Sequence, residues 1–117
     1  MPEIELPYPP ASLNPNKRLH WGQRARATKL YRSECRVLSR AQGLRPMKAD
    51  QCTIGVTFHP PDKRRRDRDN MIAAFKAGAD GLADVIQVDD ADWVVSYALG
   101  EPRKGGCVSV SIMEIGQ

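Results

Sequence analysis

Apolar and polar positions divide the chain into segments that predict four strands and two helices. Residues 3–6, EIEL, alternate with the period of two that is typical of a strand, and the prolines that follow end it. Residues 52–58, CTIGVTF, are mostly apolar and rich in β-branched side chains, which predicts a central strand. Residues 93–99 and 107–115 predict two more strands, joined by a hairpin through GEPRKGG.

Two longer segments have the period of an α-helix. Between about residues 22 and 42 the apolar positions recur at helical spacing, and Gly43 stands where a glycine often ends a helix. These apolar positions are Ala27, Leu30, Tyr31, Val37, Leu38 and Ala41. A basic stripe lies nearly opposite, formed by Lys29, Arg32, Arg36 and Arg40, and is either a solvated surface or a contact for a polyanion. Residues 70–83 predict the second helix, in which Gly78 and Gly81 weaken the later turns.

The predicted order is therefore strand, helix, strand, helix, strand, strand, in a single domain over residues 1–117. Helical crossovers make the first three strands parallel where they are neighbours, and the final hairpin adds an antiparallel strand. A mixed four-stranded sheet with both helices packed on one face buries both apolar helix faces. The expected fold class is thus α/β, of the α+β type.

Composition indicates which partners, metal sites and cellular compartments to expect. The net charge of +4 permits a polyanionic partner without requiring one. Cys35, Cys52 and Cys107 are far apart and form no CxxC pair, so reduced thiols are expected, with no zinc site or disulfide framework. The sequence has no apolar run of about 18 residues and no basic and apolar leader, which predicts a cytoplasmic protein without a membrane partner.

Two aspartates stand between the central strand and the second helix, in the stretch PPDKRRRDRDN. Residues i and i+2 of an extended chain point to the same side, so the carboxylates of Asp67 and Asp69 can converge. Converging carboxylates repel unless a proton or a cation lies between them, and Mg²⁺ prefers such ligands. Alternatively, Asp67 pairs with the neighbouring arginines and Asp69 is the N-cap of the helix.

A second acidic cluster, Asp89, Asp90 and Asp92, precedes the strand at residues 93–99. If this strand runs parallel to the central strand as its neighbour, the cluster lies at the opposite end of the sheet from the first pair of aspartates. This arrangement argues against convergence of the two clusters, unless the loop before Trp93 folds back or the strand order differs.

Lys76 lies two turns beyond Asp69 on the same face of the second predicted helix. A lysine there could stabilise negative charge on a phosphate in a transition state. The alternative is a surface ion pair with Asp80 at i, i+4.

Four segments together resemble the RusA family of Holliday-junction resolvases. They are LPYPPASLN, DKRRRDRDN followed by an amphipathic helix, VDDADWVV and GGCVSVSIMEIG, and they occur in the family's order. This resemblance spans nearly the whole chain and implies a magnesium-dependent endodeoxyribonuclease. Such an enzyme resolves four-way DNA junctions by paired symmetric cleavage during recombination and repair.

The resemblance also implies the roles of individual residues. Three family aspartates bind Mg²⁺, with Mn²⁺ as a substitute, and they match Asp67, Asp69 and Asp90. In the enzyme that names the family, the important lysine lies four residues after the second aspartate, where this chain has Ala73. We assign that role to Lys76, one turn later on the same face.

The family implies a homodimer of bacterial or phage origin whose partner is a four-way junction, with no small-molecule substrate. Phosphate contacts would dominate binding and make it sensitive to salt. The cations assigned to these contacts are Lys17, Arg18, Arg64, Arg65, Arg66 and Arg68. Two alternatives are a catalytically silent protein that binds branched DNA and a nuclease that acts on other branched DNA.

Overall fold

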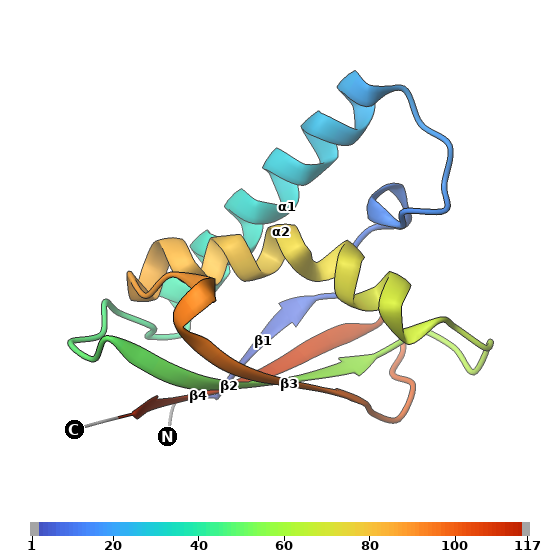
Figure 1. The fold of residues 1–117 in the computed structure, drawn as a ribbon. Coiled ribbons are helices and arrows are strands. Elements are labelled where there is room, and N and C mark those ends of the chain that lie inside the picture. Colours follow the sequence, from blue (N-terminus) through green and yellow to red (C-terminus); the bar gives the residue numbers. More distant parts are fainter. Residues whose placement is uncertain (1–2, 116–117) are drawn as a thin grey trace.

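The computed structural model of the chain describes residues 3–115. The long elements are β1 (Glu3–Pro7), α1 (Trp21–Ala41), β2 (Gln51–His59), α2 (Arg68–Ile86), β3 (Trp93–Leu99) and β4 (Cys107–Ile115). Two short 3₁₀ helices, η1 (Ala11–Leu13) and η2 (Asp90–Asp92), precede α1 and β3. Both long helices lie on one face of a four-stranded mixed sheet (Figure 1). The predicted α+β fold class and the order of the elements are confirmed.

β2 is a central strand, as its apolar sequence predicts. The strand order is β1-β4-β2-β3, in which β2 is antiparallel to β4 and parallel to β3. Alternate residues of β2 are buried, and they are Cys52, Ile54, Val56 and Phe58. The ring of Phe58 lies edge-on to that of Phe75 in α2, with centroids 5.8 Å apart, so the core is the layer between the sheet and the helices.

The connection between β3 and β4 is not the hairpin that the sequence predicts. β4 pairs with β1 and β2, and β3 lies at the edge of the sheet. The connecting residues pass around the end of β2, where the amide of Gly100 donates to the Phe58 carbonyl at 2.8 Å and that of Arg103 to the Pro60 carbonyl at 2.9 Å. The prediction fails because GEPRKGG is long enough to cross two strand spacings, about 10 Å.

The two helices approach closely at the glycines of α2. A Cβ atom at Gly81 would lie 2.5 Å from the backbone oxygen of Arg32, and one at Gly78 would lie 2.9 Å from the Tyr31 ring. Next to this contact the Arg32 guanidinium donates to both carboxylate oxygens of Asp84, each at 2.8 Å. The two glycines therefore allow α1 to pack closely on α2. They do not interrupt α2, which continues to Ile86.

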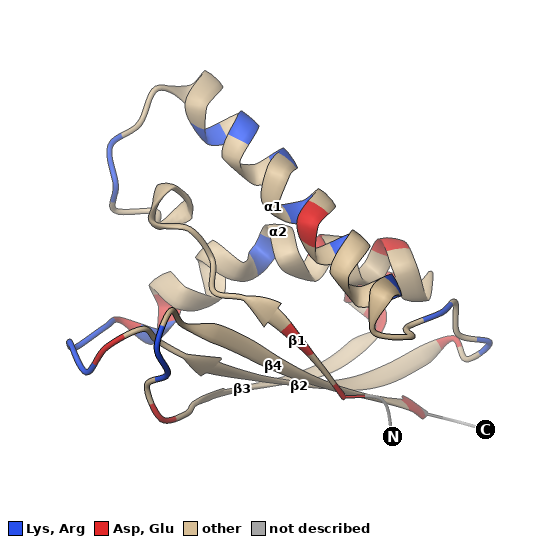
Figure 2. Cartoon of the chain, turned by 180° about the vertical axis from the view of Figure 1, so that it is seen from behind, with Lys and Arg blue, Asp and Glu red and all other residues tan. Residues whose placement is uncertain are grey.

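Only one narrow face of α1 is buried, and it consists of Tyr31, Cys35 and Ser39. Three residues of the predicted apolar face, Leu30, Val37 and Ala41, are exposed, and that part of the prediction is wrong. The physical reason is that α1 packs on α2 through a narrow face and its N-terminal half rises away from the sheet (Figure 1), so no element covers a wider apolar stripe. Lysine and arginine residues follow the helix along its length (Figure 2).

We expect Gly81→Ala to lower the free energy of unfolding by about 2 kcal/mol, because a methyl group would collide with the backbone of α1. Helix propensity alone predicts the opposite sign, a gain of about 1 kcal/mol for alanine over glycine. Urea denaturation monitored by circular dichroism measures the change. Ala73→Gly, at an exposed position of α2, is the control that reports propensity by itself. A stabilised Gly81→Ala variant would contradict the close approach.

Candidate functional site

The loop between β2 and α2 is folded around the carboxylate of Asp62. Its Oδ1 accepts a hydrogen bond from the amide of Arg64 at 2.9 Å and pairs with Nη2 of Arg66 at 2.9 Å. Nη1 of Arg66 also donates to the backbone oxygens of Asp62 and Arg64, at 3.1 and 2.8 Å. The Arg66 side chain is consequently only 19% exposed, whereas that of Arg64 is 82% exposed. Arg66 shapes the loop, and Arg64 faces solvent.

Asp62 was not among the residues singled out in the sequence. The Arg64 amide, together with the side chains of Arg64 and Arg66, lowers the pKa of the Asp62 carboxyl to about 2. The signal in the sequence was an aspartate after two prolines and two residues before Arg64. An aspartate often closes a turn at this spacing by accepting from the backbone amide two residues later.

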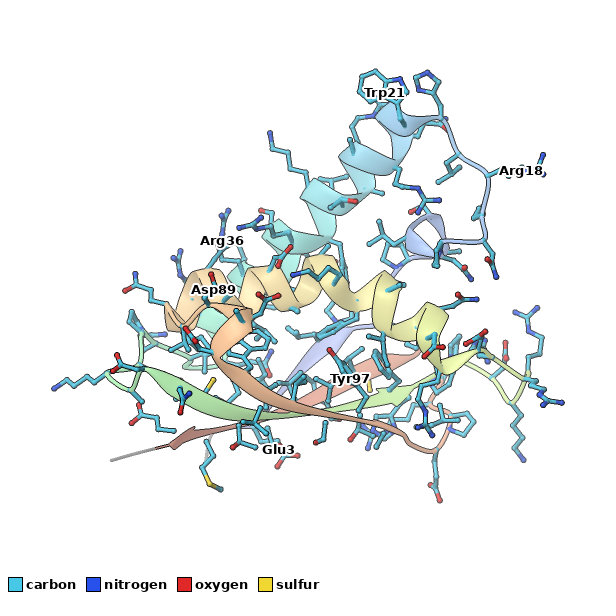
Figure 3. All side chains as sticks on the ribbon, viewed as in Figure 1. Glu3, Arg18, Trp21, Arg36, Asp89 and Tyr97 are labelled. Atoms are coloured by element: carbon cyan, nitrogen blue, oxygen red, sulfur yellow. The ribbon has the colours of Figure 1, made fainter. Side chains whose placement is uncertain are left out.

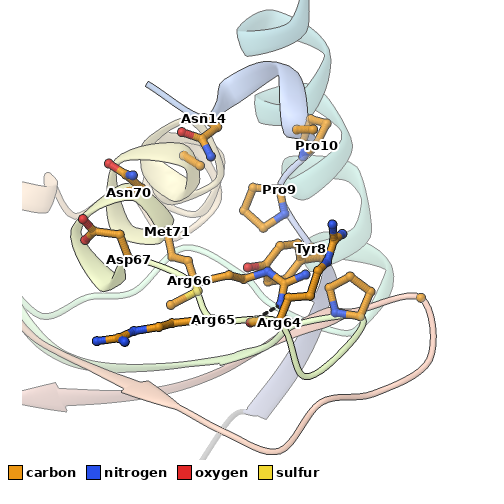
Figure 4. Close-up of a pocket in the computed structure, with 14 residues that line it drawn as sticks. Tyr8, Pro9, Pro10, Asn14, Arg64, Arg65, Arg66, Asp67, Asn70 and Met71 are labelled. Carbon is orange, nitrogen blue, oxygen red and sulfur yellow. Dashed lines mark hydrogen bonds between the residues drawn. The ribbon is translucent and has the colours of Figure 1, made fainter. Parts of the chain in front are cut away.

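A cavity of about 600 Å³ opens between this loop, the N-terminal segment and the start of α2 (Figure 4). Its polar lining includes Arg64, Arg65, Arg66, Asn14, Asp67 and Asn70, and its apolar lining includes Tyr8, Pro9, Pro10 and Met71. Burial raises the pKa of the Tyr8 hydroxyl, so that group stays neutral beside Arg66. The two exposed arginines, Arg64 and Arg65, and two side-chain amides around one cavity suit an anion such as a phosphodiester.

The first acidic pair lies at the N-terminus of α2, beside the cavity. Oδ1 of Asp67 accepts from the amide of Asp69 at 2.9 Å, which makes Asp67 the N-cap of the helix. The prediction of Asp69 as the cap is wrong, because the helix begins at Arg68, two residues earlier than the apolar pattern indicates. Asp69 lies in the first turn with its side chain exposed, where the helix dipole favours an anion.

The second acidic cluster reaches α2 through Lys76. Nζ of Lys76 donates to Oδ1 of Asp80 at 2.8 Å and to Oδ2 of Asp90. These hydrogen bonds raise the pKa of Lys76, with Asp80 the larger cause, and Lys76 lowers the pKa of Asp90. Asp90 comes within reach because η2 folds back beside α2, where Figure 3 shows the neighbouring Asp89. The predicted Lys76–Asp80 pair is confirmed, and Asp90 shares the same ammonium group.

The structure brings the predicted site residues together in two pairs. The Asp67 carboxylate accepts from the backbone amide of Asp69 at the start of α2, and Asp90 contacts Lys76 two turns later, about 10 Å further along the helix. β3 is the parallel neighbour of β2, as the sequence analysis assumed. The first acidic pair therefore follows the end of one strand, and the second cluster precedes the start of the other, at the opposite end of the sheet. Within residues 3–115 no group of three His, Cys, Asp or Glu side chains is placed to hold a metal ion.

The other predicted DNA-contacting residues, Lys17, Arg18, Arg65 and Arg68, are exposed. Lys17 and Arg18 belong to the loop before α1, and Arg65 to the loop before α2. Figure 2 shows basic residues on both loops at one end of the molecule, and both loops contribute to the lining of the 600 Å³ cavity. This end of the molecule can therefore present basic side chains from two loops to a polyanion.

Across the described part of the chain, no helix is long and apolar enough to cross a membrane. No known family model matches the sequence. The chain is similar to a protein of Xylella fastidiosa (strain Temecula1 / ATCC 700964) that is described as an uncharacterized protein. The two are 35% identical over 122 residues, which cover 100% of this chain and 79% of the relative. The chain belongs to the same family as this bacterial protein.

We expect the carboxyl of Asp62 to titrate at about pH 2, which carbon-detected NMR of the side chain measures. Because folding lowers this pKa, the contribution of Asp62 to stability is complete above about pH 4 and is lost as the pH falls toward 2. Replacing both Arg64 and Arg66 by alanine should raise the midpoint only part of the way, since the backbone amide of residue 64 remains. An ordinary midpoint near 4 in the unmodified protein would contradict the loop geometry.

Proposed function

We propose that the chain is a magnesium-dependent endodeoxyribonuclease that resolves four-way DNA junctions by paired, symmetric cleavage, in the cytoplasm of a bacterium. The observation that carries the proposal is the contact of Lys76 with Asp90. It joins two segments of the RusA-like pattern that lie far apart in the sequence, and it does so on the face of α2 that also carries Asp69. Acids and a lysine on one exposed strip, beside a cavity lined with arginines, are the groups that phosphodiester hydrolysis requires.

The basic end of the molecule would bind the DNA backbone. Arg64 and Arg65 line the cavity and are exposed. Lys17 and Arg18 add exposed positive charge in the loop before α1. Asn14 and Asn70 can donate to phosphate oxygens from the opposite wall of the cavity. Arg66 would act indirectly, because its guanidinium already holds the loop in shape.

The acidic pair fits Mg²⁺, which proteins commonly bind through one or two carboxylates, waters and substrate phosphate oxygens. Asp69 has an exposed carboxylate for this purpose, and Asp67 retains a second oxygen beyond the one that caps the helix. When bound, the cation would supply a more acidic hydrolytic water and neutralise charge on the phosphate. Lys76, held in its ammonium form by two carboxylates, would stabilise negative charge that develops during cleavage.

Replacing Asp69 by Asn should reduce Mg²⁺-dependent cleavage of a synthetic four-way junction by about 100-fold or more, because a ligand of the cation is lost. Binding of the junction should be unchanged or tighter, since a negative charge near phosphates is removed. Asp90→Asn and Lys76→Ala should lose cleavage in the same way. Gel assays of cleavage and of binding, with Mg²⁺ or with EDTA, separate the two effects.

Asp80→Asn is the matched control, because it removes the other carboxylate on Lys76 and leaves the proposed ligands in place. This variant should cleave at close to the rate of the unmodified protein. Full cleavage by Asp69→Asn would exclude that residue as a ligand. Loss of cleavage in Asp80→Asn alone would move the site away from Asp69.

One observation favours a second candidate, a silent protein that binds branched DNA. Within residues 3–115 the two acidic pairs do not form one metal-binding group. A silent protein would bind a four-way junction more tightly than a matched linear duplex and leave both intact with Mg²⁺ or Mn²⁺. Cleavage of flapped DNA in preference to junctions would point instead to a nuclease for other branched substrates.

The proposed enzyme is a homodimer, whose two-fold symmetry suits paired cuts in a four-way junction. β3 supports this assembly because it is an edge strand that carries the exposed residues Val94, Val95 and Leu99. Exposed apolar edge strands readily pair with another chain. Antiparallel pairing of two β3 strands places the start of one beside the end of the other. Asp90 of one protomer would then lie toward the α2 N-terminus of its partner.

Val94→Lys should convert the dimer into a monomer, because a charge would enter the apolar edge of β3. Light scattering coupled to size-exclusion chromatography measures the mass. Val37→Lys on α1 is the control, since Val37 is exposed to a similar extent, 56% against 61% for Val94. A dimer that survives the change at Val94, or a monomeric unmodified protein, would contradict assembly through β3.

A further inference from the structure

An exposed tryptophan stands at the end of α1 that rises away from the sheet (Figure 3). The side chain of Trp21 is 79% exposed, the most of any large apolar residue in the described chain. The ring of His20 lies next to it, with centroids 5.5 Å apart and planes inclined at 31°. We call this pair of rings the aromatic tip. Exposing so large an apolar surface is unfavourable in water, so a ligand that covers it would gain free energy.

The surroundings of the aromatic tip are cationic. Residues 6–33 contain no aspartate or glutamate, and they contain Lys17, Arg18, Arg24, Arg26, Lys29 and Arg32. Asp84 neutralises Arg32, and the other five lie nearer to the tip in sequence. A ligand that matches this surface combines negative charge with a flat ring, and the nucleotide units of DNA have both. The tip lacks the broad apolar face that insertion into a lipid surface would need, because glycine, glutamine and arginine follow Trp21 at residues 22–24.

The tip rests on a fixed support. Nη2 of Arg24 donates to the backbone oxygens of Lys17 and Asn14, at 2.6 and 3.3 Å, and ties the preceding loop to the helix. Nδ1 of His20 accepts from the amide of Gly22 at 3.1 Å, which caps α1 and holds the imidazole in place. Because the backbone at the tip and the imidazole are already held, stacking a ligand there costs less conformational entropy than on an unsupported loop.

We propose that the aromatic tip is a stacking site for an unpaired DNA base, separate from the proposed cleavage residues at α2. The inference rests on the proposed function, since it takes branched DNA as the ligand. Bases inside a linear duplex are covered on both faces by their neighbours, whereas a branch point or a single strand offers uncovered base faces. The tip would therefore favour branched or single-stranded DNA over duplex, while the surrounding cations bind any phosphate backbone.

Binding measured in EDTA tests this site without any cleavage. Trp21→Ala should weaken binding to a single-stranded oligonucleotide and to a four-way junction by about tenfold, the usual cost of losing one stacked base. Affinity for a linear duplex should change by less than about twofold. Trp21→Phe should retain most of the affinity, because a phenyl ring also stacks. Leu30→Ala, at a residue of the same helix that is 71% exposed, is the matched control and should bind as the unmodified protein does.

Fluorescence gives a second readout. The difference between the emission of the unmodified protein and that of Trp21→Phe isolates Trp21, and single-stranded DNA should quench it. Equal affinities of Trp21→Ala and the unmodified protein for the junction would overturn the inference and leave the nuclease proposal standing. An unmodified protein that binds no DNA would overturn both. Quenching or a blue shift with anionic phospholipid vesicles but not with DNA would assign the tip to a lipid surface and overturn the stacking site.

Discussion

The position of α2, held between α1 and the sheet, is the constraint on which the rest of the structure depends. Most of its residues are buried, and its two glycines let the backbone of α1 come within contact distance. A helix covered on both sides keeps one strip in water, and charged groups must lie on that strip because burying them unpaired is costly. Asp69, Lys76 and Asp80 lie there, and η2 adds Asp90. Packing thus confines the candidate chemistry to a single line of residues.

Some charged side chains pair with each other and stabilise the local structure, and others remain exposed. Arg66 and Asp62 satisfy each other and fold the loop before α2, and Arg32 and Asp84 join the two helices. Arg64, Arg65, Lys17 and Arg18 keep exposed side chains at one end of the molecule. The ion pairs elsewhere, Lys76 with Asp80 and Arg103 with Glu5, are neutral, so they take nothing from the net charge of +4. A polyanion would meet the cations first and the acidic strip beside them.

Local patterns predicted the elements well, and contacts between distant segments were the part that they missed. EIEL and CTIGVTF became strands with the expected faces buried, since alternation depends only on neighbouring residues. The hairpin prediction failed because the connection is long enough to pass around the end of β2, and β4 pairs between β1 and β2, which local patterns do not determine. Asp67 rather than Asp69 caps α2 because polar residues of its first turn lengthen the helix beyond its apolar pattern. The contact of Lys76 with Asp90 depends on the fold-back of η2, which no spacing rule contains.

The central claim is that the acids of the α2 strip bind a divalent cation, and paramagnetic broadening by Mn²⁺ tests it most directly. Mn²⁺ would be titrated into isotopically labelled protein, and the backbone amide signals followed by NMR. The account predicts that the amides of residues 67–70 and of Asp90 broaden first, and that Asp69→Asn removes this effect while Asp80→Asn does not. Broadening that is centred elsewhere, or that persists unchanged in Asp69→Asn, would contradict it.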